Sequence, residues 1–137
     1  MASNCINGKF LCTGFGLVDS QHNNFIKLLE RIRSQIPSAN KGEIDLILDE
    51  LFLYSLYHFE TEERLLEKYN LESFPKHLEQ HREYTEKMEQ FKIDCLLEKA
   101  ELTLEIIEFL EQWLINHIKE TDVIDFQAAQ KIDDAKM

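Results

Sequence analysis

Apolar residues recur along most of the chain at steps of three and four, which is the period of an amphipathic α-helix. Four segments show this period, at about residues 19–36, 42–69, 74–96 and 100–120. The chain has only four glycines and two prolines, which leaves little material for the many tight turns of an all-β fold. The pattern therefore predicts an all-α protein.

The ends of these segments carry residues that start and stop helices. Asp19 or Ser20 can cap the first helix, and Pro37 ends it. Ser73 can cap the third helix, with Pro75 in its first turn. The loops are short, so we expect an antiparallel up-down-up-down four-helix bundle over about residues 19–122. Residues 1–18 would form an N-terminal arm and 123–137 a short C-terminal helix, all in one domain over 1–137.

Composition and charge exclude several classes of function. The chain has 137 residues and a net charge of −11, which argues against nucleic acid and anionic membranes as partners. No apolar run reaches the roughly 18 residues that span a bilayer, and the first residues lack the features of a signal peptide. Three cysteines at irregular spacing suit a reducing cytosol, where they act as small packed residues. We expect a cytoplasmic protein, and its charge and few exposed apolar residues favour a monomer, with an oligomer left open.

The candidate chemistry lies in the histidines. All five fall on the apolar stripes of the predicted helices, whereas surface histidines would scatter: His22, His58, His77, His81 and His117. Two acids accompany them on the inward side, Glu62 and Asp122. Any one buried histidine is usually a plain core residue, but five together with two acids indicate a binding site.

The spacing supports one site, with one exception. His58 and Glu62 are four residues apart, as are His77 and His81, so each pair shares a helix face. His117 and Asp122 are five apart, about 140° around a regular helix. We expect Asp122 to lie at a frayed or bent helix end. In an antiparallel bundle the starts of odd helices lie beside the ends of even ones, so all seven groups collect at one end.

Five imidazoles and two carboxylates exceed the four ligands of a tetrahedral zinc, and calcium and magnesium prefer oxygen ligands. The chain has no HExxH motif of zinc proteases and no E-x-x-H of ferritin-like sites. Two near-octahedral metals bridged by carboxylates fit the set, and iron suits mixed imidazole and carboxylate. Without metal, both acids would be buried at high cost. A histidine-rich site favours diferrous iron, and therefore reversible uptake of dioxygen over its cleavage.

These segments together resemble the hemerythrin family. The resemblance rests on D19-S-Q-H22, H58-F-E-T-E62, H77-L-E-Q-H81 and W113-L-I-N-H117-I-K-E-T-D122, and it covers about residues 16–125. It implies one iron on His77, His81 and His117 and a second on His22 and His58, bridged by Glu62, Asp122 and an oxo or hydroxo group. One feature departs from the family pattern: many members carry a tryptophan in the arm, and the only tryptophan here is Trp113.

The resemblance also implies a function, reversible dioxygen binding for storage, transport or delivery, without enzymatic activity. Phe59, Trp113, Leu114 and Ile118 match the apolar positions that line the family's oxygen pocket, although each would also serve as plain core. Two alternatives stay open. The domain could sense oxygen, redox state or nitric oxide, or it could be a di-iron enzyme acting on nitric oxide, peroxide or ferrous iron.

Overall fold

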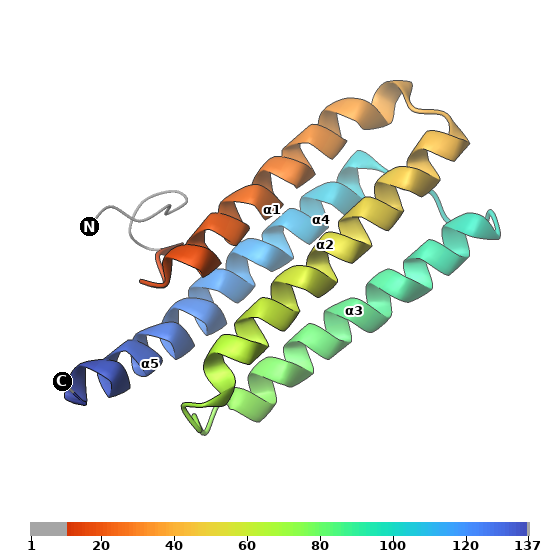
Figure 1. The fold of residues 1–137 in the computed structure, drawn as a ribbon. Helices are drawn as coiled ribbons and strands as arrows, with labels where there is room; N and C mark the ends of the chain where they lie inside the picture. Colours follow the sequence, from red (N-terminus) through yellow and green to blue (C-terminus); the bar gives the residue numbers. More distant parts are fainter. Residues whose placement is uncertain (1–10, 137) are drawn as a thin grey trace.

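The computed structural model describes residues 11–136, and over these residues it is a bundle of long helices (Figure 1). The helices are α1 (Gly16–Gln35), α2 (Lys41–Glu67), α3 (Phe74–Leu96), α4 (Leu104–His117) and α5 (Val123–Ala135). A 3₁₀ turn, η2 (Ile36–Ser38), follows α1, and a π-helical segment, η3 (Ile118–Asp122), joins α4 to α5. Successive helices α1 to α4 run antiparallel, which confirms the predicted four-helix bundle.

The start of α1 differs from the prediction. The helix begins at Gly16, and Asp19 lies inside its first turn instead of capping it. Asp19 is buried, and its Oδ1 accepts hydrogen bonds from the backbone N–H and the hydroxyl of Thr13, at 2.9 and 2.8 Å. Its carboxylate therefore ties the preceding segment to the helix. The first ten residues of the expected arm lie outside the described residues.

The starts of α2 and α4 follow ordinary capping rules, whereas the start of α3 does not. Asn40 and Glu43 form a reciprocal capping box at the start of α2. The hydroxyl of Thr103 caps α4, a few residues later than the predicted start near Ala100. Ser73 does occupy the N-cap position of α3, but its hydroxyl makes no cap bond and donates to Asp125 at 2.6 Å.

The predicted short C-terminal helix is present as α5, but it continues from α4 through η3 without a break in the helix. The residues that join α4, η3 and α5 all have right-handed helical backbone angles, and the ribbon runs unbroken through both labels (Figure 1). Asp122 therefore does not lie at a frayed or bent end, as the sequence suggested. It lies at the last position of a π-helical turn.

Two groups of buried apolar side chains flank the histidines. The larger fills the bundle around Phe25, Leu51 and Ile107, and the smaller joins α1, α2 and α5 around Val18, Leu66 and Phe126. No helix among the described residues has the length and apolar character needed to cross a bilayer.

Of the cysteines, Cys95 is buried and free, which agrees with the expected packing role. Cys5 lies outside the described residues, and the role expected for Cys12 stays a prediction. The cytoplasmic location stays a prediction.

Candidate metal centre

The structure brings all seven sequence-predicted ligands together inside the bundle. α1 contributes one of them, α2 and α3 two each, and the α4–η3 helix the last two: His22, His58, Glu62, His77, His81, His117 and Asp122. None of these side chains belongs to a residue more than 4% exposed. Such a concentration of buried polar groups requires a compensating partner.

Glu62 divides its two oxygens between two groups of histidines. Its Oε2 lies 2.8 Å from Nε2 of His22 and 3.0 Å from Nε2 of His58. Its Oε1 lies 3.0 Å from Nε2 of His81 and 3.4 Å from Nε2 of His77. The carboxylate therefore faces two clusters of nitrogen atoms at once.

Asp122 divides its oxygens in the same way. Its Oδ2 lies 3.0 Å from Nε2 of His22, while its Oδ1 lies 2.9 Å from Nε2 of His77 and 3.2 Å from Nε2 of His117. Ligands at right angles around an octahedral ion with bonds of about 2.1 Å stand about 3.0 Å apart. The spacings around both carboxylates match that value.

The π-helical segment explains how Asp122 reaches the site. In a π-helix the backbone N–H bonds to the carbonyl five residues earlier, so residues five apart stand nearly above one another. His117 and Asp122 have that separation, and the segment Ile118–Asp122 lies between them. The wide turn therefore places both side chains on the same face of the helix, whereas in a regular helix they would point about 140° apart. Thr121, inside this segment, donates its hydroxyl to Oε1 of Gln80 at 2.8 Å.

Each imidazole turns its Nε2 atom toward the cluster. In four of the five rings, a hydrogen bond at Nδ1 fixes the orientation of the ring. Four Nδ1 atoms lie 2.7–2.9 Å from side-chain oxygens outside the cluster: His58 pairs with Gln21, His77 with Asp125, His81 with Glu63 and His117 with Gln80. Carboxylate and amide oxygens only accept hydrogen bonds, so each Nδ1 must donate. In the neutral ring Nε2 then presents a lone pair to the cluster, which is the form that binds metals.

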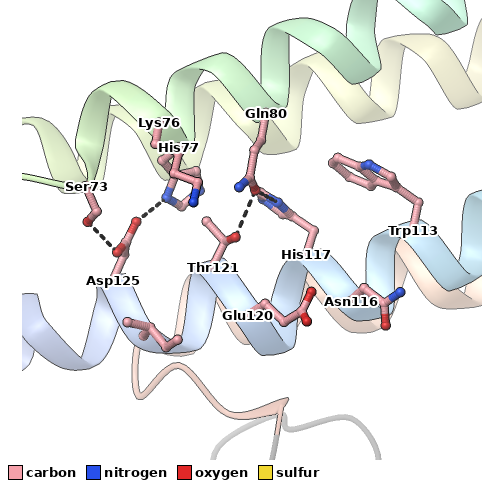
Figure 2. Close-up of a pocket in the computed structure, with 11 residues that line it drawn as sticks. Ser73, Lys76, His77, Gln80, Trp113, Asn116, His117, Glu120, Thr121 and Asp125 are labelled. Carbon is pink, nitrogen blue, oxygen red and sulfur yellow. Dashed lines mark hydrogen bonds and ion pairs between the residues drawn. The ribbon is translucent and has the colours of Figure 1, made fainter.

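Sequence analysis missed these four outer partners. Gln21, Glu63 and Gln80 each lie directly beside a predicted ligand in the chain, and Asp125 lies one helical turn after Asp122. That adjacency was the available signal. Figure 2 shows two of the contacts: Asp125 accepts from His77 and from Ser73, and the Gln80 oxygen accepts from Thr121 and from His117.

The electrostatics show that the site is built for positive charge. Burial lowers the pKa of His22, His77 and His117, but the Asp122 and Glu62 carboxylates outweigh burial and raise the pKa of His22 to about 10, of His77 to about 12 and of His117 to about 9. At His58 burial wins, and the pKa is lowered. Without metal, protons on three imidazoles would supply the positive charge that the carboxylates require.

The carboxylates mirror this behaviour. Burial raises the pKa of both groups, but the surrounding imidazoles outweigh it and hold the pKa of Glu62 and of Asp122 well below the ordinary range. Both acids are therefore ionised at neutral pH, although neither is exposed to solvent. Both Asp122 oxygens and Nε2 of His58 are buried without a hydrogen bond among the described residues. These atoms are available to bind a cation.

The donor atoms fall into two groups that share the carboxylates. One group contains His77, His81 and His117 with both acids, and the other contains His22 and His58 with both acids. Within each group the donor atoms lie within 4.8 Å of one another. Mixed imidazole and carboxylate donors suit transition metals, iron among them, better than calcium or magnesium. The residues present therefore fit a two-metal centre.

Aromatic rings cover the three-histidine group. Phe59 stacks on His81, with ring centres 4.1 Å apart and an interplanar angle of 14°. Trp113 stacks on His117 at 4.8 Å and 9°. The other two residues predicted to line an oxygen pocket, Leu114 and Ile118, are fully buried in the larger core.

Comparison with known proteins places this arrangement in a family. Residues 13–129 match the family model described as the hemerythrin HHE cation binding domain. A bacteriohemerythrin of Methylococcus capsulatus is 26% identical over 80% of this chain and 84% of its own length. A hemerythrin-like protein of Naegleria gruberi is 31% identical over 82% of each chain. A wild-type hemerythrin crystal structure is similar with a TM-score of 0.78 and 26% identity, over 82% of this chain and 86% of that one. On the match to the family model, the bundle and the clustered histidines and acids, the chain belongs to the hemerythrin family.

Proposed function

We propose that this protein binds dioxygen reversibly at a non-haem di-iron centre. The family implies non-haem iron, and the cluster of histidines and acids offers the donors that iron requires. The observation that carries the proposal is the division of each carboxylate between two groups of imidazoles. A single ion would leave one oxygen of each acid facing imidazoles that hold no metal, whereas a pair of ions would use one oxygen of each acid apiece.

The ligand roles follow from the two groups. His77, His81 and His117 would hold one iron, and His22 and His58 would hold the other. Glu62 and Asp122 belong to both groups of donors and would serve both irons, together with an oxo or hydroxo group from solvent. The group with two histidines offers one donor fewer than the group with three. That difference would leave room for dioxygen on the side of His22 and His58, and bound iron would supply the redox chemistry for its reversible uptake.

The apolar residues around the site keep water out. Phe59, Leu114 and Ile118 are buried, and Trp113 covers His117 with its ring. Exclusion of water lowers the local dielectric and slows the escape of charged, reduced oxygen species. These four residues therefore protect the centre from oxidation and favour release of dioxygen itself. On this proposal the protein is an oxygen carrier or store and not an enzyme, it acts as a monomer in the cytoplasm, and it requires neither nucleic acid nor membrane.

The test is the visible spectrum of the iron-loaded, reduced protein, recorded without air, after air, and after deoxygenation. We expect a charge-transfer band that appears with air and disappears on deoxygenation over repeated cycles. A one-way change to a stable diferric spectrum would reject reversible binding and favour a sensor or a redox enzyme acting on nitric oxide, peroxide or ferrous iron. Loss of one histidine from each group, in His77→Ala and His22→Ala, should lower the iron content below that of the wild type.

A further inference from the structure

The outer side of the three-histidine group opens into a groove between α3 and the α4–η3–α5 helix (Figure 2). This polar groove has a volume of about 520 Å³. Its lining includes mostly polar side chains from both helices: Lys76, Gln80, Asn116, Glu120, Thr121 and Asp125. His77 and His117 also line this groove. The side chain of a proposed iron ligand is therefore all that separates the groove from the proposed iron site.

A second groove continues along the same two helices. This apolar groove has a volume of about 320 Å³, and its lining is mostly apolar: Tyr84, Met88, Phe91, Ile106, Phe109 and Leu110. Phe109 is 63% exposed at its edge. Gln80 and Trp113 line both grooves, so the two grooves meet at these residues. The result is one elongated depression with a polar half and an apolar half.

Trp113 connects this depression to the metal ligands. Its indole is half-buried and stacks on the His117 ring, nearly parallel at 9°. On another side it contacts Tyr84, with ring centres 4.5 Å apart. Among the aromatic residues that stack on ligand imidazoles, Phe59 is only 3% exposed, whereas Trp113 lines the groove. Trp113 therefore provides the aromatic contact between a molecule in the groove and a ligand of the three-histidine group.

We propose that the two grooves together bind a reduced flavin, which returns the oxidised di-iron centre to its reduced form by way of Trp113 and His117. The inference rests on the proposed di-iron function. A flavin ring is planar, with an apolar benzenoid end and a polar end of N–H and C=O groups. That division matches the apolar and polar halves that meet at Trp113. The concave shape and the combined volume suit a small molecule better than a protein, which docks on flatter surfaces.

The chemistry balances with the flavin as the only reductant. A fully reduced flavin gives up two electrons, one to each ferric iron, and its ring nitrogens release two protons to solvent. The products are two ferrous ions and the oxidised flavin, which leaves the groove. An oxygen carrier requires such a step, because each accidental oxidation would otherwise leave the protein permanently inactive.

The matched test uses two neighbouring positions on α4. Asn116 and Gln112 are both exposed and share a hydrogen bond of 3.1 Å, but only Asn116 lines the groove. Asn116→Phe fills the polar groove, whereas Gln112→Phe breaks the same hydrogen bond and adds the same ring outside it. Both variants keep Trp113 as the only tryptophan. Glu120→Phe fills the groove from the next turn and serves if Asn116→Phe does not fold.

Riboflavin is first titrated into the iron-free protein while tryptophan emission is recorded. We expect saturable quenching in the wild type and in Gln112→Phe, and an affinity at least about tenfold weaker in Asn116→Phe. Stopped-flow reduction of the diferric protein by photoreduced riboflavin should saturate with flavin concentration in the wild type and be slowed by about the same factor in Asn116→Phe.

Three results would overturn the proposal: quenching that does not saturate, equal affinities in the two variants, or a reduction rate that Asn116→Phe leaves unchanged. Faster reduction by a small redox protein than by any flavin concentration would also reject the flavin assignment. The binding step uses iron-free protein and no dioxygen. Flavin binding without a reversible oxygen band would therefore refute the oxygen proposal alone, and a reversible band without flavin binding would refute only this inference.

Discussion

Loading the iron-free protein with metal must displace protons from the site. The pKa of His22 is about 10, of His77 about 12 and of His117 about 9, because the buried carboxylates stabilise the imidazolium forms. At pH 7.5 all three rings are protonated in the absence of metal. Iron binds the neutral ring, so each of the three must lose its proton on loading.

The expected magnitude differs clearly from that of ordinary histidines. The three raised groups predict release of about three protons per fully loaded chain, and of a fourth if the solvent bridge binds as hydroxide. Five imidazoles with an ordinary pKa of about 6.5 would together release only about half a proton at pH 7.5. Release of about three protons also makes the overall iron affinity rise by about three orders of magnitude per pH unit.

The assay is anaerobic calorimetric titration with ferrous iron at pH 7.5 in two buffers of different ionisation enthalpy. The difference in apparent heat between the buffers gives the number of protons released. A pH-indicator dye in weakly buffered solution gives the same number independently. Release of one proton or fewer would refute the reasoning, since it would mean that the metal-free carboxylates do not hold the imidazoles charged.

Three further predictions concern the same site. The raised histidine pKa values stabilise the iron-free fold fully below about pH 6.5, and this contribution is lost as pH rises through 9 and 10; urea midpoints that stay flat from pH 7 to 10.5 would contradict it. Asp125→Ala leaves Nδ1 of His77 without its acceptor and should weaken iron binding about 10- to 100-fold in a chelator competition, whereas Asp134→Ala, at an exposed site, should not. Leu114→Ala, at a fully buried position, should cost about 2–5 kcal/mol of unfolding free energy and speed autoxidation in air, with iron content unchanged; an unchanged autoxidation rate would remove Leu114 from the pocket.

The sequence was sufficient to predict which histidines and acids cluster, because their spacing obeys helix geometry. His58 and Glu62, like His77 and His81, share a face by their spacing of four, and the antiparallel order then brings the helices to one level. The outer partners were harder to predict. Glu63 and Gln80 read as ordinary surface residues, because their role depends on which Nδ1 atom a neighbouring helix presents. Contacts between helices are set by packing and not by the period of one segment.

The prediction that Asp19 caps α1 was also wrong, because it too considered only the local sequence. An aspartate ahead of an apolar stripe usually marks the first residue outside a helix, and Asp19 fits that rule. Its carboxylate is instead taken by the backbone and hydroxyl of Thr13, six residues earlier. The helix can then begin at Gly16 without a side-chain cap. A contact with the segment before the helix thus replaced the N-cap hydrogen bond that the sequence rule assumes.

The spacing of five residues between His117 and Asp122 did not fit a regular helix that points both side chains to one site. The π-helical segment Ile118–Asp122 explains this spacing. A π-helical turn is rare because it strains the helix, and it persists where other contacts hold it. Here Asp122, at its end, contacts His22, His77 and His117, and Thr121 donates to the same Gln80 oxygen that orients His117. The wide turn therefore exists together with the site and not independently of it. A spacing of five between two candidate ligands in a continuous amphipathic helix therefore indicates a π-helical turn, and such turns are frequent at functional sites.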